Sequence, residues 1–154
     1  LWIFRNELKS TIPTEIGNMK SLMDLRLYFN PIFGAIPQEI YNLTSLITLD
    51  IHGMRLAGTL STKIEELKNL ETFRINSNLL TGTIPKEIGN MKRLKEAWLQ
   101  HNQLTGEIPT GLCTLRSIGK IVTLEADCRT ADGSKVPLIR CPLNCCSSCY
   151  NHAN

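Results

Sequence analysis

The stretch IPTEIGNMKSLMDLRLYFNPIFG, residues 12–34, decides the fold, because its pattern recurs along the chain. The next copy, IPQEIYNLTSLITLDIHGMRLAG, occupies residues 36–58, and the Ile-Pro pair returns at Ile84-Pro85 and Ile108-Pro109. The starting positions are separated by 24 residues or a multiple of 24. Leu60-Ser61 occupies the intermediate starting position, where the proline is replaced. A fixed period of this length is typical of a solenoid, in which each repeat forms one coil and neighbouring coils bury a shared core.

Each repeat contains a short alternating segment. Leu25 and Leu27 are separated by one residue, and the same spacing recurs one period later at Leu49 and Ile51. A period of two predicts a strand whose apolar side chains point inward, so we expect these strands to stack as a parallel sheet. Ile16, Met19 and Leu22 recur at a spacing of three, which predicts a short 3₁₀ segment on the return path.

An asparagine follows the strand in most repeats, at Asn30, Asn78 and Asn102. A buried amide at this place can hydrogen-bond the backbone of the turn, so we expect a ladder of asparagines along the core. Met54 replaces the asparagine in one repeat, close to the Leu60-Ser61 replacement. The two departures together predict a local irregularity there; simple drift in a tolerant solenoid is the favoured alternative.

The repeat resembles that of plant-type, extracellular leucine-rich-repeat proteins, whose distinguishing signature is G-x-I-P. Gly34-Ala35-Ile36-Pro37, Gly82-Thr83-Ile84-Pro85 and Gly106-Glu107-Ile108-Pro109 match it. The resemblance implies an α/β solenoid, a right-handed superhelix with a concave parallel β-sheet and a convex side of 3₁₀ helices and loops. We assign residues 1–124 to the repeats, with a partial first coil and further coils starting at residues 12, 36, 60, 84 and 108.

All the cysteines lie near the end of the chain, at Cys113, Cys128, Cys141, Cys145, Cys146 and Cys149. An even number at the end of a repeat array predicts a disulfide-rich cap, which we assign to residues 125–154 and which resembles the caps of some algal leucine-rich-repeat proteins. The pairing stays open. A zinc site is the alternative, but adjacent cysteines suit one tetrahedral ion poorly. At the start of the cap, Val122 and Leu124 are predicted to be the inward strand pair, with one residue inserted.

The cysteines and one glycosylation sequon, Asn42-Leu43-Thr44, favour a secreted protein or an extracellular ectodomain; another oxidising compartment, such as an organelle lumen, is the alternative. The sequence opens on Leu1 rather than on a secretory leader, so we expect it to be part of a longer protein.

The composition of the chain excludes several classes of function. The chain has 154 residues, 42% hydrophobic and 20% charged, with a net charge of +3, which fits one globular domain. No uninterrupted apolar stretch approaches the ~18 residues of a membrane-spanning helix. No dense Lys/Arg cluster predicts nucleic-acid binding, and no phosphate, dinucleotide or metal motif predicts a cofactor.

The outward positions of the strands form columns from coil to coil, and aromatic and arginine side chains gather there. These residue types dominate binding hot spots, so we predict that the concave face binds a protein or peptide ligand, with a glycan as a further possibility. Packing of Trp98 on Arg74 that merely stiffens the sheet is the alternative explanation of such pairs. The predicted ligand-binding residues are Arg26, Tyr28, Phe29, Asp50, His52, Arg74, Asn76, Trp98, Gln100 and His101.

Catalysis is not expected. Asp50, His52 and Ser77 suggest a hydrolase-like triad, but an open sheet offers neither a shaped pocket nor free oxyanion donors. The sequence therefore predicts a non-catalytic extracellular recognition domain. The alternative is a structural subunit of a larger assembly, held through its ends.

Overall fold

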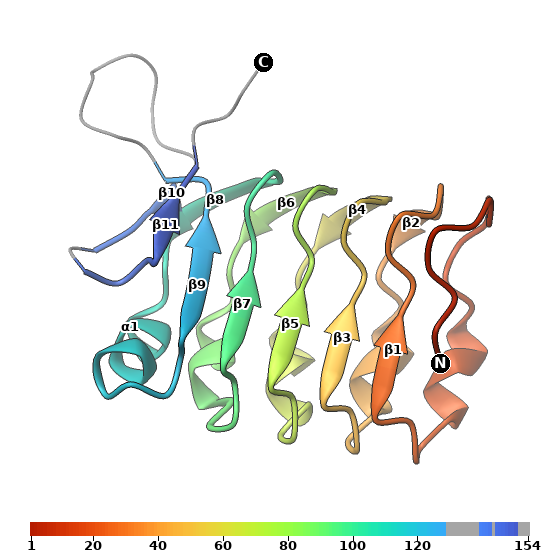
Figure 1. Cartoon of the computed structure of the whole chain (residues 1–154), viewed down its shortest axis with the longest axis horizontal. Coiled ribbons are helices and arrows are strands. Elements are labelled where there is room, and N and C mark those ends of the chain that lie inside the picture. The colour runs from red at the N-terminus through yellow and green to blue at the C-terminus, as the bar shows by residue number, and fades with distance from the viewer. Residues whose placement is uncertain (129–138, 143, 151–154) are drawn as a thin grey trace.

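The computed structural model describes residues 1–128, 139–142 and 144–150. The chain winds as a solenoid whose coils lie side by side, with the first coil at one end and the cysteine-rich segment at the other (Figure 1). Each central coil contains a strand on the front, a second strand on the back and a short helix on the return path. The predicted α/β solenoid is confirmed.

The front sheet has six parallel strands in the order β1-β3-β5-β7-β9-β11. Leu25, Leu49, Phe73 and Ala97 pair in register from coil to coil, which reproduces the period of 24 residues. Their side chains are buried, as the alternating pattern predicts. The strands are β1 (Asp24–Arg26), β3 (Thr48–Asp50), β5 (Thr72–Arg74), β7 (Glu96–Trp98), β9 (Thr123–Ala126) and β11 (Ser148–Cys149).

A second parallel sheet, which the sequence did not predict, lies on the back. It contains β2 (Phe33–Ala35), β4 (Arg55–Thr59), β6 (Leu79–Thr83), β8 (Gln103–Glu107) and β10 (Ile139–Arg140). The first four of these strands each contain the repeat glycine, Gly34, Gly58, Gly82 or Gly106, which has a positive φ of 77–89°. The convex side therefore carries hydrogen-bonded strands as well as helices and loops.

The return path carries the predicted 3₁₀ helices: η1 (Thr14–Asn18), η2 (Gln38–Asn42), η3 (Thr62–Glu66) and η4 (Lys86–Asn90). A proline stands at the N-cap of three of them, where its missing N–H costs nothing. At η3 the cap is Ser61, whose hydroxyl accepts a hydrogen bond from the Lys63 N–H.

The last coil differs from the others. Its return path is an α-helix, α1 (Thr110–Ser117), and β9 pairs Leu124 with Ala97, 27 residues earlier rather than 24. Val122 is 67% exposed, whereas Leu124 and Ala126 are buried. The predicted inward pair Val122 and Leu124 is therefore wrong: three residues are inserted, because an α-helix and the turn after it need a longer path.

The asparagine ladder is confirmed. The Asn78 amide donates to the carbonyl oxygens of Ile51 and Ile75, both at 2.9 Å, and its Oδ1 accepts from the Leu56 N–H at 3.1 Å. At Met54 the ladder is interrupted by a buried apolar side chain. The back sheet nevertheless pairs without a break from β2 through β4 to β6, so the predicted local irregularity does not occur.

The loss of proline at Ser61 is matched by a second departure. Ser61 keeps a backbone N–H, which donates to the Tyr41 hydroxyl at 3.5 Å. Tyr41 is buried at the repeat position that is glycine in two other coils, Gly17 one coil earlier and Gly89 two coils later. Burial raises the pKa of the Tyr41 phenol. The two replacements therefore stabilise each other.

None of the helices in the described part of the chain is long and apolar enough to span a membrane.

Candidate ligand-binding face

The outward side chains of the front sheet form rows that run across the coils, because residues in successive strands pair in register. We call this surface the front face; it is the face predicted to be concave and turns toward the viewer in Figure 1. The first row contains Trp2, Arg26, Asp50, Arg74, Trp98 and Glu125, and the second contains Phe4, Tyr28, His52, Asn76, Gln100 and Asp127.

An aromatic stack covers the first three coils of the front face. The Phe4 and Tyr28 rings are parallel with centroids 4.7 Å apart, and His52 stacks on Tyr28 at the same distance. Phe29 meets the His52 ring edge-on at 4.7 Å and is 48% exposed. Stacked and edge-on pairs of this kind hold the rings in fixed positions, so this half of the face offers a rigid apolar surface.

Phe29 belongs to a third row whose backbone is left-handed. Arg5, Phe29, Ser77 and His101 have φ values of 52–58°, which side-chain-bearing residues rarely adopt. The remaining member of the row is Gly53, where an added Cβ would lie 2.4 Å from the Phe29 ring. The glycine therefore leaves the space into which Phe29 packs.

Arg74 is the centre of the charged part of the front face. Its Nη2 donates to the Glu96 carboxylate at 2.8 Å, its Nη1 lies 3.8 Å from Asp50, and its guanidinium lies 5.0 Å from the Trp98 ring centroid. Asp50 is buried and contacts His52 Nδ1 at 2.5 Å. Arginine, aromatic ring and carboxylates thus form one network that crosses three coils.

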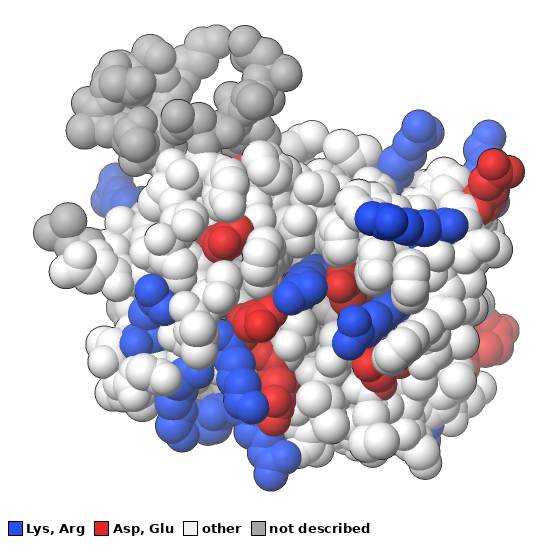
Figure 2. Space-filling model, in the orientation of Figure 1, with Lys and Arg blue, Asp and Glu red and all other residues white. Residues whose placement is uncertain are grey.

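Arg26 repeats this arrangement on a smaller scale. Its Nε donates to Asp24 at 2.9 Å, and its guanidinium lies 5.1 Å from the Trp2 ring. The hydrogen bond and the negative charge of Asp24 raise the pKa of Arg26. Acidic and basic side chains accordingly alternate across the middle of the front face (Figure 2).

The last coil adds two acidic residues that the sequence analysis missed. Glu125 accepts a hydrogen bond from Gln100 Nε2 at 2.8 Å, and Asp127 accepts from the backbone N–H groups of His101 and Asn102. A hydrogen bond to Glu125 raises the pKa of the Tyr150 phenol. The three-residue insertion hid both positions, because a strict period of 24 assigns other residues to these rows.

Four side-chain atoms of the predicted site are buried without a hydrogen-bond partner in the described part of the chain. They are the donors Arg74 Nε and Trp98 Nε1 and the acceptors Asn76 Oδ1 and Gln100 Oε1. Native proteins pair most buried polar atoms, so a cluster of four unpaired atoms on two adjacent coils is unusual.

The residues of the imagined catalytic triad are only partly brought together. Asp50 contacts His52, but the His52 ring stacks on Tyr28, and no hydrogen bond between His52 and Ser77 occurs among the described residues. Asn42, the predicted glycosylation site, is exposed at the end of η2 on the return path, away from the front face.

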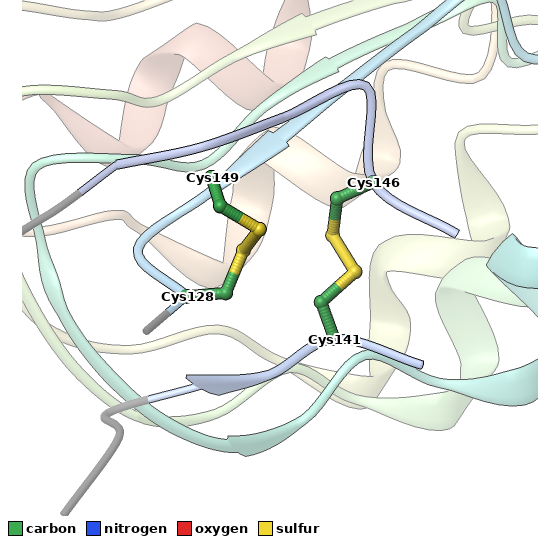
Figure 3. A group of neighbouring side chains, drawn as sticks. All are labelled: Cys128, Cys141, Cys146 and Cys149. Carbon is green, nitrogen blue, oxygen red and sulfur yellow. A yellow bond between two sulfur atoms is a disulfide. The ribbon is translucent and has the colours of Figure 1, made fainter. Parts of the chain in front are cut away.

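All six cysteines form disulfides, as predicted. Cys113 of α1 pairs with Cys145, Cys128 after β9 pairs with Cys149 of β11, and Cys141 pairs with Cys146. The last two bonds lie side by side, their four sulfur atoms within 4.8 Å of one another (Figure 3). The thiolates that the alternative zinc site requires are thus used in disulfides, a state typical of an oxidising compartment.

Comparison with known proteins gives the family. The Leucine Rich Repeat family matches residues 69–91 and 93–115. The plant peptide hormone receptor RGFR1, solved in complex with RGF2, is 33% identical over 82% of the chain, with a TM-score of 0.76. The chain carries leucine-rich repeats and matches proteins of the plant type.

Further solved structures of plant receptors are similar to this leucine-rich-repeat protein. The ectodomain of the Arabidopsis thaliana receptor kinase GASSHO1/SCHENGEN3, in complex with CASPARIAN STRIP INTEGRITY FACTOR 2, is 36% identical over 77% of the chain, with a TM-score of 0.73. The SOBIR1 ectodomain from the same plant is 26% identical over 79% of the chain, with a TM-score of 0.73. The chain spans 14% of the GASSHO1/SCHENGEN3 chain, 20% of RGFR1 and 64% of SOBIR1. A comparison with curated proteins finds no match.

Proposed function

We propose that this leucine-rich-repeat protein is a non-catalytic extracellular recognition module that binds a protein or peptide ligand on its front face. The network of Arg74, Trp98, Glu96, Asp50 and His52 carries the proposal. It places aromatic and guanidinium groups, the side chains that dominate binding hot spots, on a surface that the core does not need.

The similar solved structures support a peptide or protein as the ligand. Two of them, the GASSHO1/SCHENGEN3 ectodomain and RGFR1, are complexes named with CASPARIAN STRIP INTEGRITY FACTOR 2 and RGF2, and RGFR1 is described as a peptide hormone receptor. The receptor ectodomains among them and the three disulfides of this chain support an extracellular location. Glycan binding has no comparable support.

The test is ligand capture by chemical cross-linking, with mass spectrometry, in the cells or medium from which the protein comes. The Arg74→Ala/Trp98→Ala variant should lose the cross-linked partner while it stays folded at the assay temperature, although its unfolding temperature should fall because buried Asp50 loses a neighbouring cation. Phe33→Ala/Arg55→Ala is the matched control, because these residues are an exposed aromatic–arginine pair in register on the back sheet. The control should keep the partner.

The alternative, a structural subunit held through its ends, predicts a different map of cross-links. Leu1, Trp2 and Met23 are exposed apolar side chains of the first coils. If cross-links gather there or after Cys128, and persist in Arg74→Ala/Trp98→Ala, the proposed binding face is wrong.

A further inference from the structure

Carboxylates outnumber guanidinium groups around Arg74 on the front face. Asp50 of β3, Glu96 of β7 and Glu125 of β9 share this surface with the Arg74 guanidinium of β5. The whole chain has a net charge of +3, so the negative surface is local. A surface of this sign attracts cations and steers them toward it.

Of these three carboxylates, Glu125 is the one whose negative charge has no positively charged partner among the described residues. It is 8% exposed, and its carboxylate accepts a hydrogen bond from the neutral amide of Gln100. In the described part of the chain no lysine or arginine forms a salt bridge with it. Acidic atoms over β9 are surrounded by uncharged ones in Figure 2. A buried carboxylate is costly unless a cation pairs with it.

The atoms without partners fit the same kind of ligand. Asn76 Oδ1 and Gln100 Oε1 accept hydrogen bonds, and together with Glu125 they suit a positively charged group that donates several hydrogen bonds. Lysine ammonium and arginine guanidinium donate several hydrogen bonds and accept none. Trp98, which lies in register between Arg74 and Glu125, adds an aromatic ring that stabilises a nearby cation.

We infer that the β7–β9 end of the front face binds a lysine or arginine side chain of the ligand, with the cation beside Glu125. The inference rests on the proposed function and specifies the ligand as a basic peptide. The two donors without partners, Arg74 Nε and Trp98 Nε1, then bind main-chain carbonyl oxygens of the same segment. Because these atoms are buried, the half-buried Arg74 and Trp98 side chains shift when the ligand enters.

The opposite end of the face sets the spacing within the ligand. Phe29 and Tyr28 follow β1, and Glu125 lies in β9, four strands further along the sheet. At about 4.8 Å per strand, the two ends are about 19 Å apart, which an extended peptide of about six residues spans. The ligand therefore carries an apolar residue about six positions from its basic residue.

A display library of random 12-residue peptides tests the inference on the full, disulfide-bonded chain. Peptides selected on the wild type should be enriched in lysine or arginine, with an aromatic or aliphatic residue about six positions away. Selection on Glu125→Gln should lose the enrichment in basic residues. Glu107→Gln is the matched control, an exposed glutamate of the back sheet that pairs with Arg140, and it should keep the enrichment.

One selected peptide then serves as a probe of affinity. Replacing its basic residue with alanine, or Glu125 with glutamine, should weaken binding about thirtyfold. Glu96→Gln, whose carboxylate faces the same cluster, is a second variant in case Glu125→Gln folds poorly in a thermal unfolding assay. In a Trp2→Phe background, the fluorescence of Trp98 should change when the peptide binds.

The outcomes separate the two proposals. Peptides that bind without a basic residue, or that bind Glu125→Gln and Glu96→Gln as tightly as the wild type, overturn the inference and leave the proposed function standing. If no peptide prefers the wild type to Arg74→Ala/Trp98→Ala, both are overturned.

Discussion

The Asn102 side chain satisfies three backbone groups inside the core. Its amide donates to the carbonyl oxygens of Ile75 and Leu99 at 3.0 Å, and its Oδ1 accepts from the Leu80 N–H at 3.1 Å. Asn102→Ala leaves the Leu99 carbonyl and the Leu80 N–H unpaired inside the core, whereas the Ile75 carbonyl keeps its hydrogen bond from Asn78. We expect the free energy of unfolding to fall by about 2–4 kcal/mol in a denaturant titration.

Gln103, the next residue, is the control for this prediction, because it is exposed. Gln103→Ala should change stability by about 0.5 kcal/mol or less. Equal denaturation midpoints for the two variants would show that the ladder does not stabilise the fold.

Tyr41 and Ser61 are a coupled pair, joined by the hydrogen bond from the Ser61 N–H to the Tyr41 hydroxyl. Tyr41→Phe and Ser61→Pro each remove this bond, so each should destabilise the protein by about 1 kcal/mol. The loss of unfolding free energy in the double variant should be clearly smaller than the sum of the losses in the two single variants, because the same hydrogen bond can be removed only once. Strict additivity in this double-mutant cycle would show that the two replacements are independent.

At the scale of single residues, strand alternation was a sound guide within the regular coils. Arg26, Asp50, Arg74 and Trp98 share a row because a strand has a period of exactly two and every coil there has the same length. Their hydrogen bonds were not predictable in this way. Whether Arg74 pairs with Glu96 or stacks on Trp98 depends on side-chain rotamers, which a sequence pattern does not specify.

Among the elements, the contact between η4 and α1 depends on two glycines. A Cβ added to Gly89 would lie 2.7 Å from the Gly111 Cα, so Gly89→Ala forces the two helices apart. We expect a loss of about 1–3 kcal/mol, measured by thermal unfolding. Lys86→Ala, at an exposed position at the start of η4, is the control and should unfold close to the wild-type temperature. If Gly89→Ala matches it, the close approach is not needed.

The elements of the return path were predictable in part. A spacing of three between apolar residues marked the 3₁₀ helices, since it is the period of that helix. The back sheet was missed because its strands consist largely of threonine, glycine and other outward residues without an alternating apolar pattern. What creates it is the stacking of equal coils, which places Gly58 beside Leu80 and leaves backbone groups facing one another.

For the whole molecule, the disulfides differ in what they constrain. Cys113–Cys145 joins α1 to a segment 32 residues later, whereas Cys141–Cys146 closes a loop across 5 residues. A longer loop restricts the unfolded chain more, so replacing the first pair with serine should cost about 4 kcal/mol and the second about 2 kcal/mol.

Hydrogen exchange should show where the loss occurs. In a solenoid each coil contacts only its neighbours, so the Cys113→Ser/Cys145→Ser variant should expose β9 and α1 while η1, β1 and β3 keep their protection. Uniform loss of protection along the chain would mean that the protein unfolds as a single cooperative unit.

The architecture as a whole was the most predictable level, because one repeated pattern determines every central coil. Two features of the architecture were not predicted: the back sheet and the length of the last coil. Both depend on how neighbouring coils stack and not on the pattern within a single repeat. Glu125 and Asp127 were missed because of the second feature: α1 shifts the row by three residues, and no local signal in residues 118–124 marks the shift.

Because the central coils have equal lengths, the distance between two sites on the front face changes in steps of one strand spacing. Duplicating residues 36–59 would add one complete coil between Phe29 and Glu125 and would move them apart by one strand spacing, about 4.8 Å. Neither end would change its own chemistry. The distance between the two features that the proposed ligand would match can therefore be altered in whole steps by coil number alone, without changing the residues at either end.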